Sequence, residues 1–152
     1  LYYDTYFVFS VQEELGLRGA GISAEKINPD FSIVVETTTS GDNPEFSSYR
    51  RSTELGKGPA ITFAHSGYVI DERLFKWIID TAKEHNITYQ IKRRTAGGTD
   101  ARRIATTLAG IPSAVISIPA RYIHSPMSVL NLEDYNNTLG LISILLTKEV
   151  QL

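Results

Sequence analysis

Two adjacent glutamates, Glu13 and Glu14, have the type and position in this sequence that could most directly do chemistry. They follow an apolar run at residues 6–11 and precede a glycine-containing stretch at residues 16–20. Neighbouring carboxylates repel each other unless a cation lies between them or one is protonated. Successive side chains on an extended chain also point to opposite sides. One glutamate could therefore bind a metal ion while the other faces a substrate as a base; a solvated strand end is the alternative.

Histidines supply the next candidates. His124 lies in a loop between Pro119 and Pro126, and two prolines stiffen that loop and give the ring a fixed direction, which a metal ligand needs. His65 is a second, less constrained candidate. His85 stands at the end of a predicted helix, where we expect a surface residue that compensates the helix dipole.

Two further acidic positions are less specific. Glu36 ends a β-branched run and becomes a candidate ligand beside Glu14, although a surface residue at a strand end is the alternative. Asp42 is interpreted as the side chain of an Asx turn. The segment Gly97-Gly98-Thr99-Asp100 lacks the Lys-Ser/Thr pair of a phosphate loop. We expect it to line a substrate cleft or brace a ligand, with a simple helix cap at Asp100 as the alternative.

Composition narrows the function classes. The 152 residues include no cysteine, which excludes disulfides, thiol catalysis and thiolate metal sites, so any metal must sit on carboxylates and histidines. A net charge of −2 argues against nucleic acid and anionic membranes as partners. No signal peptide or membrane span is visible, and we expect a cytoplasmic protein. No Ser-His-Asp signature appears, and two adjacent carboxylates cannot flank one sugar bond as a glycosidase requires.

Hydrophobic patterns predict the elements that must position these side chains. Apolar runs predict strands, and helical periodicity with capping residues predicts helices. In the last helix we expect one apolar face. The predicted strands cover residues 5–11 (buried), 31–36, 59–64, 88–93 and 112–118. The predicted helices cover residues 18–27, 71–85, 101–109 and 132–149, and a long loop covers 37–57. The apolar residues of the last helix are Leu132, Tyr135, Leu139, Ile142 and Leu146.

This alternation predicts one α/β domain in three layers, α/β/α, around a mostly parallel twisted sheet. Ligands of such folds bind at the carboxyl ends of the strands. The candidate residues all follow predicted strands, and we therefore expect Glu14, Glu36 and His124 to converge at one edge of the sheet.

Three segments resemble one known family. Residues 11–20, 97–101 and 119–126 together look like the tetrahedral aminopeptidases, the glutamyl and deblocking aminopeptidase family of di-metal peptidases. The three blocks occur in the family's order and at plausible spacing, and nearly the whole chain is similar in character. Some relatives carry an endoglucanase label, to which the carboxylate argument gives no chemical support.

The resemblance implies a role for each candidate residue. It implies a zinc exopeptidase fold, two zinc or cobalt ions, removal of N-terminal residues from peptides, and dimers assembled into hollow dodecamers. By resemblance, Glu13 is the general base, Glu14, Glu36 and His124 are metal ligands, Gly98, Thr99 and Asp100 lie beside the active site, and Arg121 braces the loop of His124.

One departure from the family is serious. The family also uses a histidine and a metal-bridging aspartate that precede the glutamate pair, together with an inserted β domain for dimerisation, and none of these is present. Asp4 is too close to Glu13 to substitute. We therefore expect residues 1–152 to be the C-terminal portion of a catalytic domain with its N-terminal part missing, and to be inactive alone. A non-catalytic assembly or binding module is the rival hypothesis.

Overall fold

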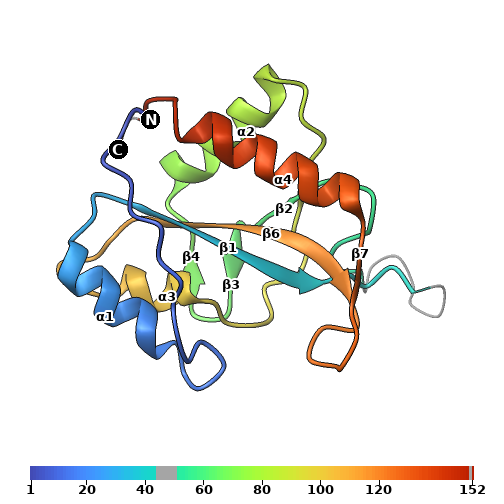
Figure 1. Ribbon diagram of the computed structural model, residues 1–152, viewed down its shortest axis with the longest axis horizontal. Coiled ribbons are helices and arrows are strands. Elements are labelled where there is room, and N and C mark those ends of the chain that lie inside the picture. The colour runs from blue at the N-terminus through green and yellow to red at the C-terminus, as the bar shows by residue number, and fades with distance from the viewer. Residues whose placement is uncertain (44–50, 151) are drawn as a thin grey trace.

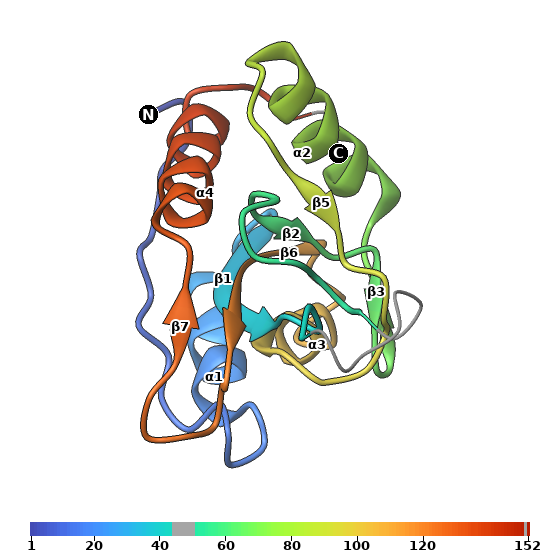
Figure 2. The ribbon, with the colours of Figure 1, turned by 90° about the vertical axis from the view of Figure 1, so that its right-hand side faces the viewer.

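Two pairs of helices enclose a mixed sheet in the computed structural model, which describes residues 1–43, 51–150 and 152 (Figure 1). Helices α1 and α3 lie on one face, and α2 and α4 lie on the other (Figure 2). The predicted three-layer α/β/α architecture is confirmed. The elements are α1 (Arg18–Ile27), β1 (Ser32–Thr39), β2 (Ala60–Ile61), β3 (Ala64–His65), β4 (Tyr68–Val69), α2 (Glu72–Glu84), β5 (Gln90–Ile91), α3 (Asp100–Ala105), β6 (Ser113–Arg121), β7 (Val129–Leu130) and α4 (Leu132–Leu145).

The sheet has the order β1-β6-β2-β5, with β7 also paired to β6, and β3 and β4 form a separate hairpin. Its longest pairing joins β1 and β6 in parallel over the whole of β1, with Glu36 opposite Ser117. Strands β2 and β5 are also parallel, whereas β2 and β7 run antiparallel to β6. Because β1 lies at the end of this order, one of its backbone edges has no partner strand among the described residues.

Helix α2 forms as its local sequence predicts. The Asp71 side chain accepts a hydrogen bond from the backbone N–H of Arg73 at 2.9 Å and so caps the first turn. Leu74, Ile78 and Ala82 recur on one face and are fully buried against the sheet. The core that they join is apolar and continuous; it includes Ile61, Ile70, Ala101, Val115, Ile116, Leu141 and Leu145.

Only part of the predicted apolar face of helix α4 faces the core: Ile142 packs against it, whereas the face is exposed nearer the start of the helix. Leu132, Tyr135 and Leu139 are 73%, 46% and 54% exposed. The buried positions are Asp134, Thr138, Leu141 and Leu145. The reason is a long-range polar contact: the Asp134 carboxylate accepts hydrogen bonds from the backbone N–H groups of Gly56 at 2.8 Å and Gly58 at 2.7 Å. These bonds satisfy the buried charge, so a polar residue can face the core.

Residues 5–11 do not form the predicted buried strand. They pair with no other strand of the described chain, and the side chains of Phe7 and Phe9 are 69% and 95% exposed. A β-branched and aromatic run favours an extended backbone, but a strand also requires a neighbour for its N–H and C=O groups. The prediction was therefore right about extension and wrong about pairing and burial.

Other boundaries differ from the prediction in smaller ways. The predicted strand 59–64 divides into β2 and β3, which belong to different sheets. Strand β1 continues to Thr39, so Glu36 lies inside it rather than at its end. Helix α3 ends at Ala105, and α4 ends at Leu145. The predicted loop at 37–57 includes residues 44–50, which lie outside the described residues.

Candidate active site

Glu13 and Glu14 lie in a hydrogen-bonded turn directly before α1. The backbone oxygen of Glu13 accepts bonds from the N–H groups of Gly16 at 3.1 Å and Leu17 at 2.8 Å. Gly19 permits this arrangement, because a Cβ there would lie 2.5 Å from the backbone oxygen of Val11. The turn gives the two carboxylates different surroundings: Glu13 is half-buried and Glu14 is exposed.

His124 lies in the loop that connects β6 to β7. Tyr122 and His124 both have a backbone φ near 62°, in the left-handed region that residues other than glycine rarely adopt. The Ser125 hydroxyl stabilises the turn through bonds to the carbonyl oxygens of Tyr122 and Met127, both at 2.6 Å. A loop held in this way has a defined shape and presents its histidine in a defined direction.

The structure brings His124 and Glu14 into contact. Nδ1 of His124 lies 3.1 Å from Oε1 of Glu14, and both side chains are largely exposed. The turn before α1 and the β6–β7 loop protrude at the same end of the molecule (Figures 1 and 2). The pair combines an imidazole nitrogen with a carboxylate oxygen, two atom types that bind zinc.

Glu36 is the most perturbed carboxyl group at this end of the sheet. Its pKa is raised to about 7, first by burial and then by the negative charges of Glu13 and Asp100, while the ammonium of Lys92 and the Ser117 hydroxyl oppose the shift. The Ser117 hydroxyl lies 3.5 Å from Oε1 of Glu36. Lys92 was not predicted as part of this site, since nothing in the sequence places it near Glu36.

The pKa of Glu13 is also raised. The first cause is burial, followed by the charges of Glu14 and Asp100, while His124 acts in the opposite direction. Glu13 therefore interacts electrostatically with Glu14 in the same turn, with His124 in the β6–β7 loop and with Asp100 at the start of α3. The carboxylates of Glu13, Glu14 and Asp100 together form a region of negative potential, which a cation would stabilise.

The Gly97–Asp100 segment delivers one of these carboxylates. Thr99, rather than Asp100, caps α3, and its side chain accepts from the N–H of Ala101 at 3.0 Å. Asp100 is buried and accepts a hydrogen bond from the Ser10 hydroxyl at 2.5 Å through Oδ2, whereas its Oδ1 is buried without a hydrogen-bond partner among the described residues. Gly97 has φ 92°, which makes the turn into α3 possible. The exposed Gly98 has open space around it.

Arg121, the last residue of β6, binds Asp42 through two hydrogen bonds. Nε lies 2.8 Å from Oδ1, and the second guanidinium contact to Oδ2 is 3.0 Å. Asp42 also accepts a hydrogen bond from the Ser40 hydroxyl at 3.0 Å. An Asx turn, the interpretation from the sequence, accounts neither for this bond nor for the partner on β6. Spacing along the chain carries no signal for such a pair.

The remaining histidines are not in contact with this pair. His65 is buried on β3, where its ring packs on Tyr68, and burial lowers its pKa. His85 caps the end of α2, as predicted. Within residues 1–43, 51–150 and 152, no three His, Asp or Glu side chains lie close enough together to hold one metal ion. The structure thus brings together two of the three predicted ligands, Glu14 and His124. Glu36 forms no metal-binding group with them among the described residues, and the acidic charges that act on it are those of Glu13 and Asp100.

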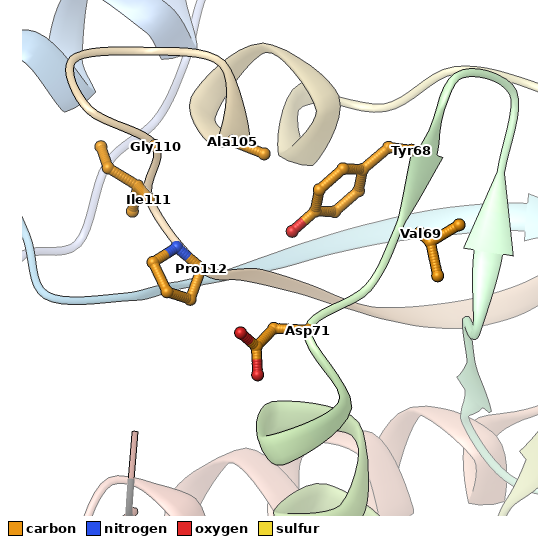
Figure 3. Close-up of a pocket in the computed structure, with 7 residues that line it drawn as sticks. All are labelled: Tyr68, Val69, Asp71, Ala105, Gly110, Ile111 and Pro112. Atoms are coloured by element: carbon orange, nitrogen blue, oxygen red, sulfur yellow. The ribbon is translucent and has the colours of Figure 1, made fainter.

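A hollow of about 290 Å³ lies at the opposite end of β6 (Figure 3). Tyr68 and Asp71 point into it, and Ala105 and Pro112 contribute to its wall. Both polar groups already have partners, since the Tyr68 hydroxyl bonds to the backbone of Ser113 and Asp71 binds Arg73. Because none of the residues that line the hollow is a candidate site residue, the hollow is separate from the candidate site.

Comparison with known proteins identifies relatives over nearly the whole chain. Residues 1–141 match the M42 glutamyl aminopeptidase family. A putative aminopeptidase of Acetivibrio thermocellus is 43% identical over 139 residues, which are 91% of this chain and 42% of that protein. The lysyl aminopeptidase of Pyrococcus furiosus is 36% identical over 146 residues, 94% of this chain and 40% of that protein.

Solved structures give the same result. An aminopeptidase of Desulfurococcus kamchatkensis superposes with a TM-score of 0.90 at 34% identity, covering 93% of this chain and 40% of its own. A Thermotoga maritima structure described as an endoglucanase has a TM-score of 0.70 at 51% identity, and the match covers 94% of this chain and 40% of that one. The PhTET1-12s dodecamer has a TM-score of 0.77 at 29% identity, with 91% and 40% covered. The chain therefore spans about 40% of the length of these relatives.

Proposed function

Since this chain belongs to the M42 glutamyl aminopeptidase family, we propose that it forms the C-terminal portion of the catalytic domain of a metal-dependent aminopeptidase that removes N-terminal residues from peptides. The contact between Glu14 and His124 carries the proposal, because it joins two side chains suited to metal binding from segments far apart in sequence. We propose this activity for a complete protein of which these residues are one part, because they match only 42% of the length of the Acetivibrio thermocellus relative.

We assign Glu14, Glu36 and His124 as ligands of two divalent cations, zinc or cobalt. The donor set fits: carboxylate oxygens and an imidazole nitrogen, without thiolate, suit exchangeable ions of this kind. Two observations support the fit, namely the unpartnered Oδ1 of buried Asp100 and the raised pKa of Glu36. When bound, such ions polarise the scissile carbonyl and lower the pKa of a water.

Glu13 is the proposed general base. Its carboxylate is not engaged in the Glu14–His124 pair, and burial raises its pKa above the ordinary value of 4.5, which makes it a stronger base. One carboxylate oxygen would accept the proton from the attacking water. The same group would then deliver that proton to the leaving amine. Gly98, Thr99 and Asp100 would line the substrate site, and Arg121 would brace the loop of His124.

Self-association is part of the proposal. The PhTET1-12s relative is a dodecamer, and we propose dimers and a larger assembly for this protein as well, with peptide substrates as its other partners. We propose the cytoplasm as its location and no nucleic-acid partner. Among the described helices, none has both the length and the apolar character to cross a membrane.

The test uses the complete protein after removal of metal and again after addition of zinc or cobalt. Release of N-terminal residues from short peptides should disappear with the metal and return with it. Intact assembly without hydrolysis in either state would favour the assembly module. Hydrolysis of soluble cellulose fragments instead of peptides would favour the activity that the Thermotoga maritima relative's description suggests.

A further inference from the structure

The Asp42 carboxylate connects three separate segments beside the proposed site. It receives two bonds from Arg121 at the end of β6, one from the N–H of Leu55 at 3.0 Å, and one from the hydroxyl of Ser40, just after β1. The Asp42 side chain is only 9% exposed. Four donors on one nearly buried carboxylate fix its orientation, because each of its oxygens accepts two of the bonds.

Arg121 is also the residue from which the loop of His124 departs. Its backbone still pairs with Val129 of β7, and the next residue, Tyr122, already has a positive φ. A guanidinium bound through two parallel hydrogen bonds has a fixed plane as well as a fixed position. The two-bond contact therefore constrains the direction in which the chain leaves β6, immediately before the strained turn that carries His124.

We infer that Asp42 is a positioning residue for the proposed metal site: by fixing Arg121, it holds the loop that presents His124 to Glu14. This inference rests on the proposed function. It differs from the local role expected of an Asx turn, in which the side chain would bond only to the backbone two residues further on. If Asp42 acts in this way, loss of its carboxylate and loss of the two-bond contact from Arg121 should misplace His124 in the same manner.

The experiment measures zinc affinity of the complete, folded protein by competition with a chelator. Asp42→Asn removes the charge at nearly constant shape, and Arg121→Lys keeps the charge but cannot form the two-bond contact. Residues that orient metal ligands typically change metal affinity by about 10–100-fold, and we expect a loss of this size for each variant. The double variant should lose no more than the larger single loss. Asp80→Asn is the matched control, since it makes the same change in the exposed pair with Lys76 on α2.

A second readout is the NMR signal of the His124 imidazole in the metal-free protein, which should shift in Asp42→Asn and in Arg121→Lys but not in Asp80→Asn. If Asp42→Asn does not fold, the zinc affinity and the His124 NMR signal of Arg121→Lys test the positioning role. Wild-type zinc affinity in the Asp42 and Arg121 variants, together with a loss in His124→Ala, would overturn the positioning role alone. Wild-type affinity in His124→Ala as well would overturn the proposed metal site and this inference with it.

Discussion

Nδ1 of His124 lies 3.1 Å from Oε1 of Glu14, although the two residues come from the loop before β7 and the turn before α1. If this pair belongs to a metal site, His124→Ala should lower the zinc content of the complete protein, because imidazole is a ligand that zinc binds well. His85→Ala is the control, as His85 lies at the end of α2. Elemental analysis checks the prediction. Unchanged zinc content would move the assignment towards the buried His65.

Glu13→Gln should preserve fold and metal but reduce turnover. Glutamine has nearly the same shape as glutamate and cannot accept the proton, and loss of a general base typically costs about 10²–10⁴-fold in rate. The measurement is kcat of metal-replete protein, with Glu25→Gln, a change on α1, as the control. A kcat close to that of the wild type would show that Glu13 is not the base.

Gly19→Ala should destabilise the turn that holds Glu13 and Glu14. The added Cβ would lie 2.5 Å from the backbone oxygen of Val11, a contact that requires backbone movement. Overpacking of this kind costs about 1–3 kcal/mol in unfolding free energy. Gly140→Ala on α4 is the matched control, because nothing lies within 4 Å of its Cβ position and alanine favours helix. Urea unfolding of both variants measures the difference; equal stability would contradict the close approach.

The Asp42–Arg121 contact should make stability depend on pH in the acid range. The pKa of Asp42 is lowered from 3.8 to about 2, first by the Arg121 guanidinium and then by the Leu55 N–H and the Ser40 hydroxyl, while burial opposes the shift. A lowered pKa in the folded state stabilises the protein above the unfolded pKa, and this contribution disappears as pH falls through the folded value. The stability advantage of the wild type over Asp42→Asn should therefore shrink between about pH 4 and pH 2. Urea unfolding of the metal-free protein along this range tests it, and a constant difference would be the contrary result.

Residues 1–152 expressed alone should be inactive and should self-associate. Residues 5–11 have no partner strand in the described chain, and they expose Phe7 and Phe9. A segment with unpaired backbone groups and exposed apolar side chains readily pairs with other chains. We propose that other parts of the complete protein cover it. Lysine at both phenylalanine positions should reduce association in analytical ultracentrifugation. Peptide hydrolysis by the unaltered 152-residue chain at the rate of the complete protein would contradict the incomplete site.

Local signals predicted the helices well and long-range contacts poorly. The Asp71 cap and the spacing of Leu74, Ile78 and Ala82 define α2 within its own sequence. The buried face of α4, by contrast, depends on the bonds from Gly56 and Gly58 to Asp134, which periodicity does not reveal.

The candidate site shows the same division. The sequence named Glu14 and His124, and the structure brings them into contact. It did not name Asp42 as the partner of Arg121 or Lys92 as a neighbour of Glu36, because both relationships arise only when β1, β6, β2 and β5 assemble into one sheet. Residues 5–11 were predicted to be buried because an apolar run indicates where a chain prefers to be covered, not which partner covers it.

If Glu14, Glu36 and His124 bind catalytic metal ions, anomalous scattering at the zinc edge should locate zinc beside these three side chains. The measurement uses crystals of the complete protein grown with zinc. We expect anomalous peaks about 2.0–2.2 Å from ligand atoms of all three side chains. Zinc peaks elsewhere in the protein, with these three side chains free of metal, would contradict this assignment.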